Sequence, residues 1–122
     1  MIRVAKPYIS EKAIDSVSEV LRSGNLVQGK YVDEFEKKLE KYIDTKHAVL
    51  VSSGTAALHL SLLALGVKKN DEVLVPSITY LATYQAITAT GATPISCDVY
   101  EDNILLNIED AESKITKKTK VI

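Results

Sequence analysis

One segment of the chain combines hydroxyl groups and a glycine at a spacing that suits anion binding. The residues Ser52-Ser53-Gly54-Thr55-Ala56 follow a short apolar run and precede a helical pattern. The first N–H groups of a helix have no partner within it, and the helix dipole favours an anion there. Glycine lets the backbone approach a ligand closely, and the hydroxyls add donors. The segment predicts a phosphate site, although helix capping by Ser53 or Thr55 would explain the same residues.

A second segment, Pro76–Thr83, again stands between a predicted strand and a predicted helix. It contains Tyr80, whose ring could lie flat against a planar ligand. The alternative is a packed, partly buried tyrosine with a satisfied hydroxyl. Because parallel sheets hold ligands outside the carboxyl ends of their strands, the two turns could together hold a ligand with a phosphate and an aromatic ring.

Apolar runs and helical patterns alternate along the chain and predict the elements that position these turns. Ser10 opens a helical pattern that ends at Gly24, and a second helix with a charged outer face is predicted over Tyr31–Ile43. From Ala48 onward, strands alternate with helices, which is typical of parallel crossover units. The predicted strands are Ala48–Val51, Val73–Val75, Ile95–Val99 and an opening at Val121-Ile122; the helices are Thr55–Leu65, Thr79–Thr90 and Ile108–Ile115.

The fold class is therefore predicted to be α/β, with a mostly parallel sheet and crossover helices. A strand that opens at the last two residues indicates an incomplete sheet, because buried strand groups need partners on both sides. We expect an N-terminal helical segment with a loop over residues 1–44 and a partial α/β domain over residues 45–122.

The composition excludes several classes of function. Hydrophobic residues make up 46% and charged residues 25%, as in soluble globular proteins, and the net charge of −1 provides no basic field for nucleic acid. The short cluster Lys117, Lys118 and Lys120 is interpreted as a solvated turn. Neither a signal peptide nor an apolar stretch of membrane-spanning length is present, so we expect no membrane partner and a cytoplasmic location.

The residues that most often bind metals or act as nucleophiles are few. Cys97 is the only cysteine, so it can form neither an internal disulfide nor a thiolate metal site, and we expect it in the core. His47 and His59 lack a partner motif and are interpreted as structural. No metal site is predicted.

Five stretches stand in an order that identifies a family. They are SGNLVQG at Ser23–Gly29, EFE at Glu34–Glu36, SSGTAALHL at Ser52–Leu60, NDEVLVPSITYLAT at Asn70–Thr83 and GATPISCDV at Gly91–Val99. Together they cover much of the chain and resemble the DegT/DnrJ/StrS family of sugar aminotransferases.

The resemblance implies the N-terminal part of the large domain of a fold-type I transferase that uses pyridoxal 5'-phosphate. Such enzymes are homodimers that commonly transfer an amino group from an amino acid to a nucleotide-linked keto sugar, in amino-sugar and polysaccharide biosynthesis. By motif, Gly54, Thr55 and Ala56 would bind the cofactor phosphate, and Tyr80 would stack on the pyridine ring. The loop Asn25–Gly29 would lie near the substrate and the dimer contact, although many relatives have tryptophan where this chain has Asn25.

Two patterns of the family do not occur in these residues. One is the serine-led motif of the Schiff-base lysine, since Lys114 follows Ser113 directly and stands at the wrong spacing. The other is the acidic motif whose aspartate faces the pyridine nitrogen, since Asp98 matches a structural acid. We therefore expect no catalytic residue in this chain, which would be inactive alone. A natural, non-catalytic α/β protein that binds a phosphate ligand or a protein partner is the alternative, and another branch of fold-type I enzymes is a third possibility.

Overall fold

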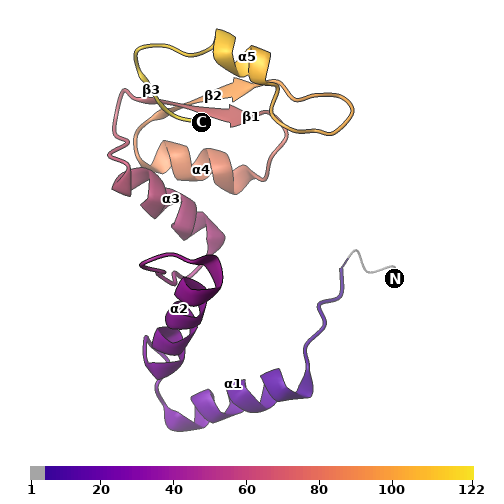
Figure 1. Ribbon diagram of the computed structural model, residues 1–122, viewed down its shortest axis with the longest axis vertical. Coiled ribbons are helices and arrows are strands. Elements are labelled where there is room, and N and C mark those ends of the chain that lie inside the picture. The colour runs from indigo at the N-terminus through magenta and orange to yellow at the C-terminus, as the bar shows by residue number, and fades with distance from the viewer. Residues whose placement is uncertain (1–4) are drawn as a thin grey trace. The chain divides into compact units, whose positions relative to one another are not determined.

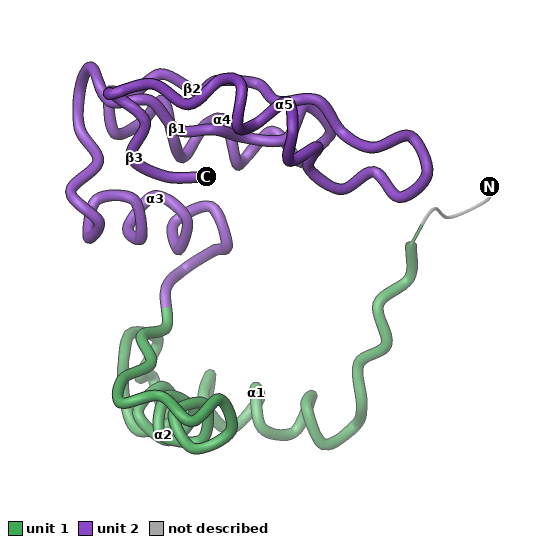
Figure 2. Tube along the Cα trace, turned by 45° about the horizontal axis from the view of Figure 1, so that its top comes forward, with its two compact units in different colours: residues 1–50 green, residues 51–122 purple. Residues whose placement is uncertain are grey.

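The computed structural model describes residues 5–122, which belong to two compact units. The boundary between them follows Leu50 (Figure 2). We call residues 5–50 the N-terminal unit and residues 51–122 the sheet unit.

The N-terminal unit consists of two helices, α1 (Glu11–Ser23) and α2 (Lys30–Ile43), joined by a loop. Ser10 caps α1, because its Oγ accepts a hydrogen bond from the Ala13 N–H at 3.2 Å. Gly24 ends the helix in the left-handed conformation, with φ +72°, which glycine adopts without steric cost. The predicted limits of both helices are thus confirmed to within a residue or two.

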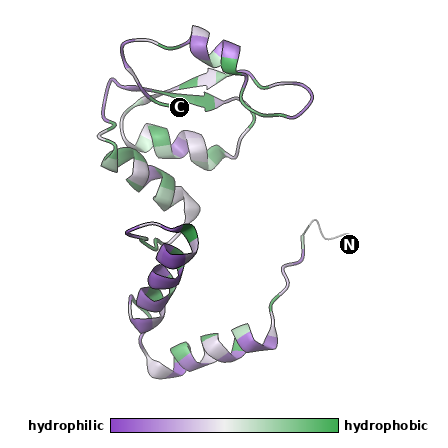
Figure 3. Ribbon diagram, viewed as in Figure 1, coloured by the Kyte–Doolittle hydropathy of each residue, from purple (hydrophilic) through white to green (hydrophobic). Residues whose placement is uncertain are grey.

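Both helices leave their apolar stripes uncovered by the described chain. No residue of α1 or α2 is buried, and Val17 and Phe35 keep exposed fractions of 58% and 50%. Figure 3 shows α2 as mostly hydrophilic, in contrast to the hydrophobic strand β1 (Glu72–Pro76) of the sheet unit. The pattern correctly predicts the helices, but the apolar side chains of α2 are not buried among residues 5–50.

The strand predicted over residues 48–51 is absent, and that prediction is wrong. Two glutamates of α2 bind the backbone here instead: Glu40 Oε1 accepts from the Ala48 N–H at 3.3 Å, and Glu36 Oε1 accepts from the Leu50 N–H at 2.8 Å. A strand needs a neighbouring strand for its N–H groups, and in this segment side-chain carboxylates take that place. These bonds also explain why residues 45–50 group with α2 and not with the sheet.

The sheet unit contains three parallel strands in the order β2-β1-β3 (Figure 1). Besides β1, they are β2 (Thr93–Cys97) and β3 (Thr119–Val121). The register places Val75 opposite Ser96 and Pro76 opposite Cys97. The predicted α/β class and parallel sheet are confirmed, whereas β2 begins two residues earlier than predicted and Val99 instead forms an isolated bridge with Leu106.

Helices cover both faces of this sheet. Side chains alternate along a strand, so Val73 and Val75 pack with Ile87 of α4 (Leu81–Ala89), while Leu74 packs with Ala111 of α5 (Ile108–Ser113). Helix α3 (Gly54–Ala64) packs on α4 and adds Leu62 to the first of these clusters. Cys97 lies in the second cluster and is buried, as the sequence predicts.

Candidate functional site

The first predicted turn forms the N-terminus of α3. Ser53 caps the helix, because its Oγ accepts from the Ala56 N–H at 3.1 Å. Capping therefore accounts for one donor of this turn, as the alternative explanation requires. Among residues 5–122, however, the N–H groups of Gly54 and Thr55 have no hydrogen-bond partner, and both residues are exposed. Two backbone donors at the positive end of a helix dipole remain available to an anion.

Space for a ligand is present at the same turn. A Cβ added at Gly54 would meet no atom within 4 Å, so the backbone here is open to solvent and not packed against the protein. An oxyanion could reach the Gly54 and Thr55 N–H groups without displacing a side chain. A phosphate group fits this position.

The second predicted turn leads from β1 into α4. Tyr80 precedes the first residue of α4 with φ −68° and ψ 141°, and its side chain is 83% exposed. The expected alternative, a packed and partly buried tyrosine, does not describe it. The turn itself is tied down, since the Thr83 N–H donates to the Tyr80 carbonyl at 3.0 Å and the Oγ1 atoms of Thr79 and Thr83 lie 3.0 Å apart.

A pocket of about 550 Å³ brings the two turns together. Gly54 and Thr55 line it from one side and Tyr80 from the other. Its remaining lining residues are Ala57, Leu58 and Ser61 of α3 and Ala82 and Thr83 of α4. Sequence reasoning missed these residues, although the spacing of Gly54, Leu58 and Ser61 places them on one face of a helix and could have revealed them. The pocket thus offers backbone donors at one end and an aromatic ring at the other.

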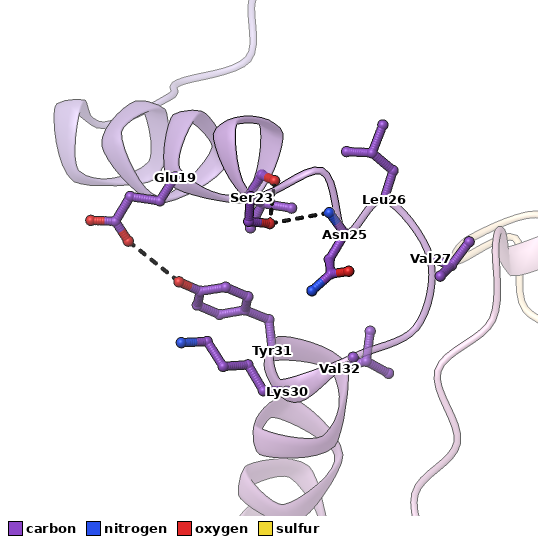
Figure 4. Close-up of a pocket in the computed structure, with 10 residues that line it drawn as sticks. Glu19, Ser23, Asn25, Leu26, Val27, Lys30, Tyr31 and Val32 are labelled. Atoms are coloured by element: carbon purple, nitrogen blue, oxygen red, sulfur yellow. Dashed lines mark hydrogen bonds between the residues drawn. The ribbon is translucent and has the colours of Figure 1, made fainter.

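Asn25 lies elsewhere, in a second pocket within the N-terminal unit (Figure 4). This pocket has a volume of about 640 Å³ and lies between the end of α1 and the start of α2. The Asn25 N–H donates to Ser23 Oγ at 3.2 Å, and the Tyr31 hydroxyl donates to Glu19 Oε2 at 3.3 Å. Leu26, Val27 and Val32 give the pocket an apolar wall.

The titratable groups with shifted pKa values lie around α5. A hydrogen bond from the Lys114 ammonium, at 2.7 Å, and one from the Asp98 N–H lower the pKa of Asp110. The bond with Asp110 in turn raises the pKa of Lys114, whose Nζ also donates to the Ser96 carbonyl at 2.9 Å. Lys114 is therefore held as a charged structural group at the end of β2.

A tyrosine and a glutamate form a further pair at the start of α5. The hydroxyl of Tyr100 donates to Glu109 Oε2, which raises the pKa of the tyrosine and lowers that of the glutamate. The same hydroxyl accepts from the Ile108 N–H at 3.2 Å. The pair fixes the loop after β2 to α5.

Neither a metal site nor a membrane span is found in the described part of the chain. No three His, Cys, Asp or Glu side chains of residues 5–122 lie close enough together to hold a metal ion. Within the same range, no helix has both the length and the apolar character to cross a bilayer.

Two known proteins with sequences similar to this chain carry the names of sugar-nucleotide enzymes. GDP-perosamine synthase of Escherichia coli O157:H7 is 43% identical over 99% of this chain and 34% of its own length. An enzyme of Shewanella sediminis named UDP-4-amino-4-deoxy-L-arabinose–oxoglutarate aminotransferase is 40% identical over 98% of this chain and 31% of its own length. The chain spans about a third of the length of the curated relatives it matches.

Solved structures agree in fold as well as in sequence. Spr1654 of Streptococcus pneumoniae in its pyridoxal phosphate form superimposes with a TM-score of 0.91 at 40% identity, over 98% of this chain and 31% of that one. DesV of S. venezuelae gives a TM-score of 0.81 at 41% identity, over 88% of this chain and 29% of that one. Residues 7–122 match the profile of one family over almost their whole length. The chain belongs to the DegT/DnrJ/EryC1/StrS aminotransferase family.

Proposed function

We propose that this chain is the N-terminal part of a pyridoxal phosphate-dependent aminotransferase that acts on a nucleotide-linked keto sugar. One observation carries the proposal: a single pocket joins the two available N–H groups at Gly54 and Thr55 to the exposed ring of Tyr80. Pyridoxal phosphate has the matching pair of groups, a phosphate and a planar aromatic ring. When bound, it supplies the electron sink for amino-group transfer, while the protein supplies binding and orientation.

Each site residue has a separate role in this proposal. The N–H groups of Gly54 and Thr55, with the Thr55 hydroxyl, bind the phosphate; Ala56 contributes through the helix turn that Ser53 caps. Tyr80 stacks on the pyridine ring. Leu58 provides an apolar wall that excludes water beside it.

The apolar and aromatic part of the pocket favours this function over a simple phosphate-binding protein. A protein that binds only phosphate needs donors and positive charge, and gains nothing from a tyrosine left 83% exposed beside them. The non-catalytic alternative predicts equal affinity for phosphate and for a phosphorylated pyridine. The aminotransferase proposal predicts a preference for the latter.

The rest of the catalytic apparatus is proposed to lie outside these 122 residues. Neither the lysine that holds the cofactor covalently nor the acid that faces its pyridine nitrogen has a matching motif here, and Lys114 is bound to Asp110. The sugar nucleotide, the amino-acid donor, a homodimeric assembly, a cytoplasmic location and a substrate role for Asn25 are parts of the same proposal. If it holds, borohydride treatment after incubation with pyridoxal phosphate will not label one lysine stoichiometrically; a single fully labelled lysine would contradict it.

The experiment that tests the site compares two ligands by calorimetric titration of the chain. Pyridoxine 5'-phosphate carries ring and phosphate but no aldehyde, so it cannot react with lysines, and inorganic phosphate is the reference. We expect Thr55→Val to lower the affinity for both ligands about ten-fold, because one hydrogen bond to a charged group is lost. Tyr80→Ala should lower the affinity for pyridoxine 5'-phosphate about five-fold and leave the affinity for inorganic phosphate unchanged.

The matched control is Tyr42→Ala, which removes a tyrosine of similar exposure, 88%, from the N-terminal unit. It should change neither affinity. Equal binding of the two ligands by the unmodified chain, or a Tyr80→Ala variant that binds both as before, would refute the proposed site.

A further inference from the structure

A hydroxyl group of α4 lies at the ends of two neighbouring strands. The Tyr84 hydroxyl is 3.0 Å from Ser96 Oγ on β2 and 3.4 Å from the carbonyl oxygen of Pro76, the last residue of β1. The two hydroxyl protons allow Tyr84 to donate to one oxygen while Ser96 donates to the Tyr84 hydroxyl. When Tyr84 donates to the Pro76 carbonyl and accepts from the Ser96 hydroxyl, one side chain links the helix to the carboxyl ends of both strands.

The faces of the sheet explain why Ser96 is the partner. Cys97 points toward α5, where it packs with Leu74 and Ala111. Since side chains alternate along a strand, Ser96 points to the opposite face, toward α4. The Tyr84 ring is half-buried against the core cluster on that face, so its hydroxyl reaches the strand ends from a fixed position.

The end of β2 is held from the other face as well. Lys114 of the α5 side donates to the Ser96 carbonyl at 2.9 Å, and the Ser77 N–H donates to the Cys97 carbonyl at 2.7 Å. The end of β2 is thus bound by Tyr84 and by Lys114, and it is also joined to Ser77, the residue that follows β1. Tyr84 is the only member of this arrangement that belongs to the helix following the turn.

The turn that carries Tyr80 depends on this attachment. The side chain of Tyr80 makes no hydrogen bond among residues 5–122, so nothing it binds sets its direction. Its backbone is tied to the first turn of α4 by the bond from the Thr83 N–H to the Tyr80 carbonyl and by the Thr79–Thr83 hydroxyl pair. Tyr84 follows directly and attaches that first turn to Pro76, where the Ser77–Tyr80 turn begins.

We propose that the hydrogen bonds joining Tyr84 to Ser96 and Pro76 make Tyr84 a positioning residue, which holds the Ser77–Tyr80 turn so that the Tyr80 ring faces the cofactor ring. This inference rests on the proposed function. Tyr84 itself touches neither ligand group in this account, and it is absent from the lining of the pocket. Its effect must therefore pass through Tyr80, which makes the inference testable by a double-mutant cycle.

The test measures affinity for pyridoxine 5'-phosphate and for inorganic phosphate in Tyr84→Phe, Tyr80→Ala and the double variant. Tyr84→Phe keeps the packed ring and removes only the hydroxyl, so the sheet unit should still fold. We expect Tyr84→Phe to weaken the binding of pyridoxine 5'-phosphate about three-fold, because one neutral hydrogen bond that holds the turn is lost. The affinity for inorganic phosphate should not change. In the Tyr80→Ala background, the same change should have no further effect.

Two further variants separate this role from general destabilisation. Ser96→Ala removes the partner hydroxyl and should reproduce the loss seen in Tyr84→Phe. Tyr100→Phe is the control, because it deletes another hydrogen-bonded tyrosine hydroxyl of the sheet unit, bound to Glu109 and not to the strand ends; it should leave both affinities unchanged.

The results distinguish a failure of the positioning role from a failure of the proposed function. Additive losses in the double variant, or an equal loss for phosphate, would overturn the positioning role. If Tyr80→Ala weakens pyridoxine 5'-phosphate but Tyr84→Phe and Ser96→Ala do not, the inference fails while the proposed function stands. If Tyr80→Ala has no effect, the proposed function itself fails.

Discussion

The N-terminal unit contains two amphipathic helices with no buried residue, whereas each helix of the sheet unit buries at least one residue. All buried hydrophobic residues of the described chain belong to residues 51–122, among them Val73, Val75 and Ile87. In residues 5–50, Ile14, Val17 and Leu21 repeat at helical spacing and remain between 46% and 62% exposed. A periodic apolar stripe is thus enough to specify a helix, whereas a core requires a second surface of matching shape.

The difference also determines where a site can be held rigidly. The two turns of the proposed cofactor site start α3 and α4, and both helices contribute residues to one buried core cluster. The pocket around Asn25 is bounded by helices without buried residues. Its shape depends on local hydrogen bonds such as that between Tyr31 and Glu19.

The largest expected difference in the free energy of unfolding is between two isoleucine-to-alanine substitutions, one in each unit. Ile87→Ala should destabilise the sheet unit by about 3 kcal/mol, because it leaves a cavity beside Val73 and Val75. Ile14→Ala, at a position 46% exposed, should change the free energy of unfolding by less than about 0.5 kcal/mol. Urea unfolding followed by circular dichroism measures both, and equal losses would show that the N-terminal unit has a core of its own.

A smaller contrast is expected between two glycines that follow helices and adopt the left-handed conformation. Gly91 has φ +83°, and an added Cβ would lie 3.3 Å from the Lys69 Cβ; Gly24 has φ +72° and open space around it. Alanine carries a conformational cost of about 1–2 kcal/mol in this region of backbone space at both positions. We expect Gly91→Ala to lower the urea midpoint of the sheet unit, and Gly24→Ala to increase only the amide exchange of the last turn of α1. A lowered urea midpoint of the sheet unit in Gly24→Ala would contradict this separation.

The smallest effect should be a change in stability with pH at the end of β2. Bonds from Lys114 and from the Asp98 N–H lower the pKa of Asp110 in the folded chain. A carboxyl whose folded pKa lies below its unfolded pKa stabilises the fold above the unfolded value, near 3.9, and that contribution disappears as the pH falls through the folded pKa. Asp110→Asn should therefore flatten the stability profile below about pH 4; an unchanged acid limb in urea titrations would contradict the assignment.

Much of the fold could be predicted because local chemistry decides it. Ser10 and Ser53 cap their helices, and Gly24 ends α1 with a positive φ, as the sequence indicates. The parallel sheet followed from the alternation of strands and helices. The turn at Tyr80 follows β1 and starts α4, as predicted, whereas the turn at Thr55 starts α3 without the predicted strand before it.

Other features could not be predicted, because they depend on contacts between separate segments or on the position of a strand in the sheet. Residues 48–51 have a strand-like composition, but Glu36 and Glu40 bind their backbone. Strand β2 begins at Thr93 although Pro94 lacks an N–H, which an edge position of the sheet tolerates. The bond between Tyr84 and Ser96 joins residues twelve positions apart, and no motif predicts it.

The most direct test of the proposed cofactor site is a heteronuclear NMR titration of the chain with pyridoxine 5'-phosphate. The amide signals of Gly54 and Thr55 and the ring signals of Tyr80 should shift together with one dissociation constant. Inorganic phosphate should shift only the amides. Perturbations confined to the Asn25 pocket or to surface lysines, with Gly54 and Tyr80 unchanged, would contradict it.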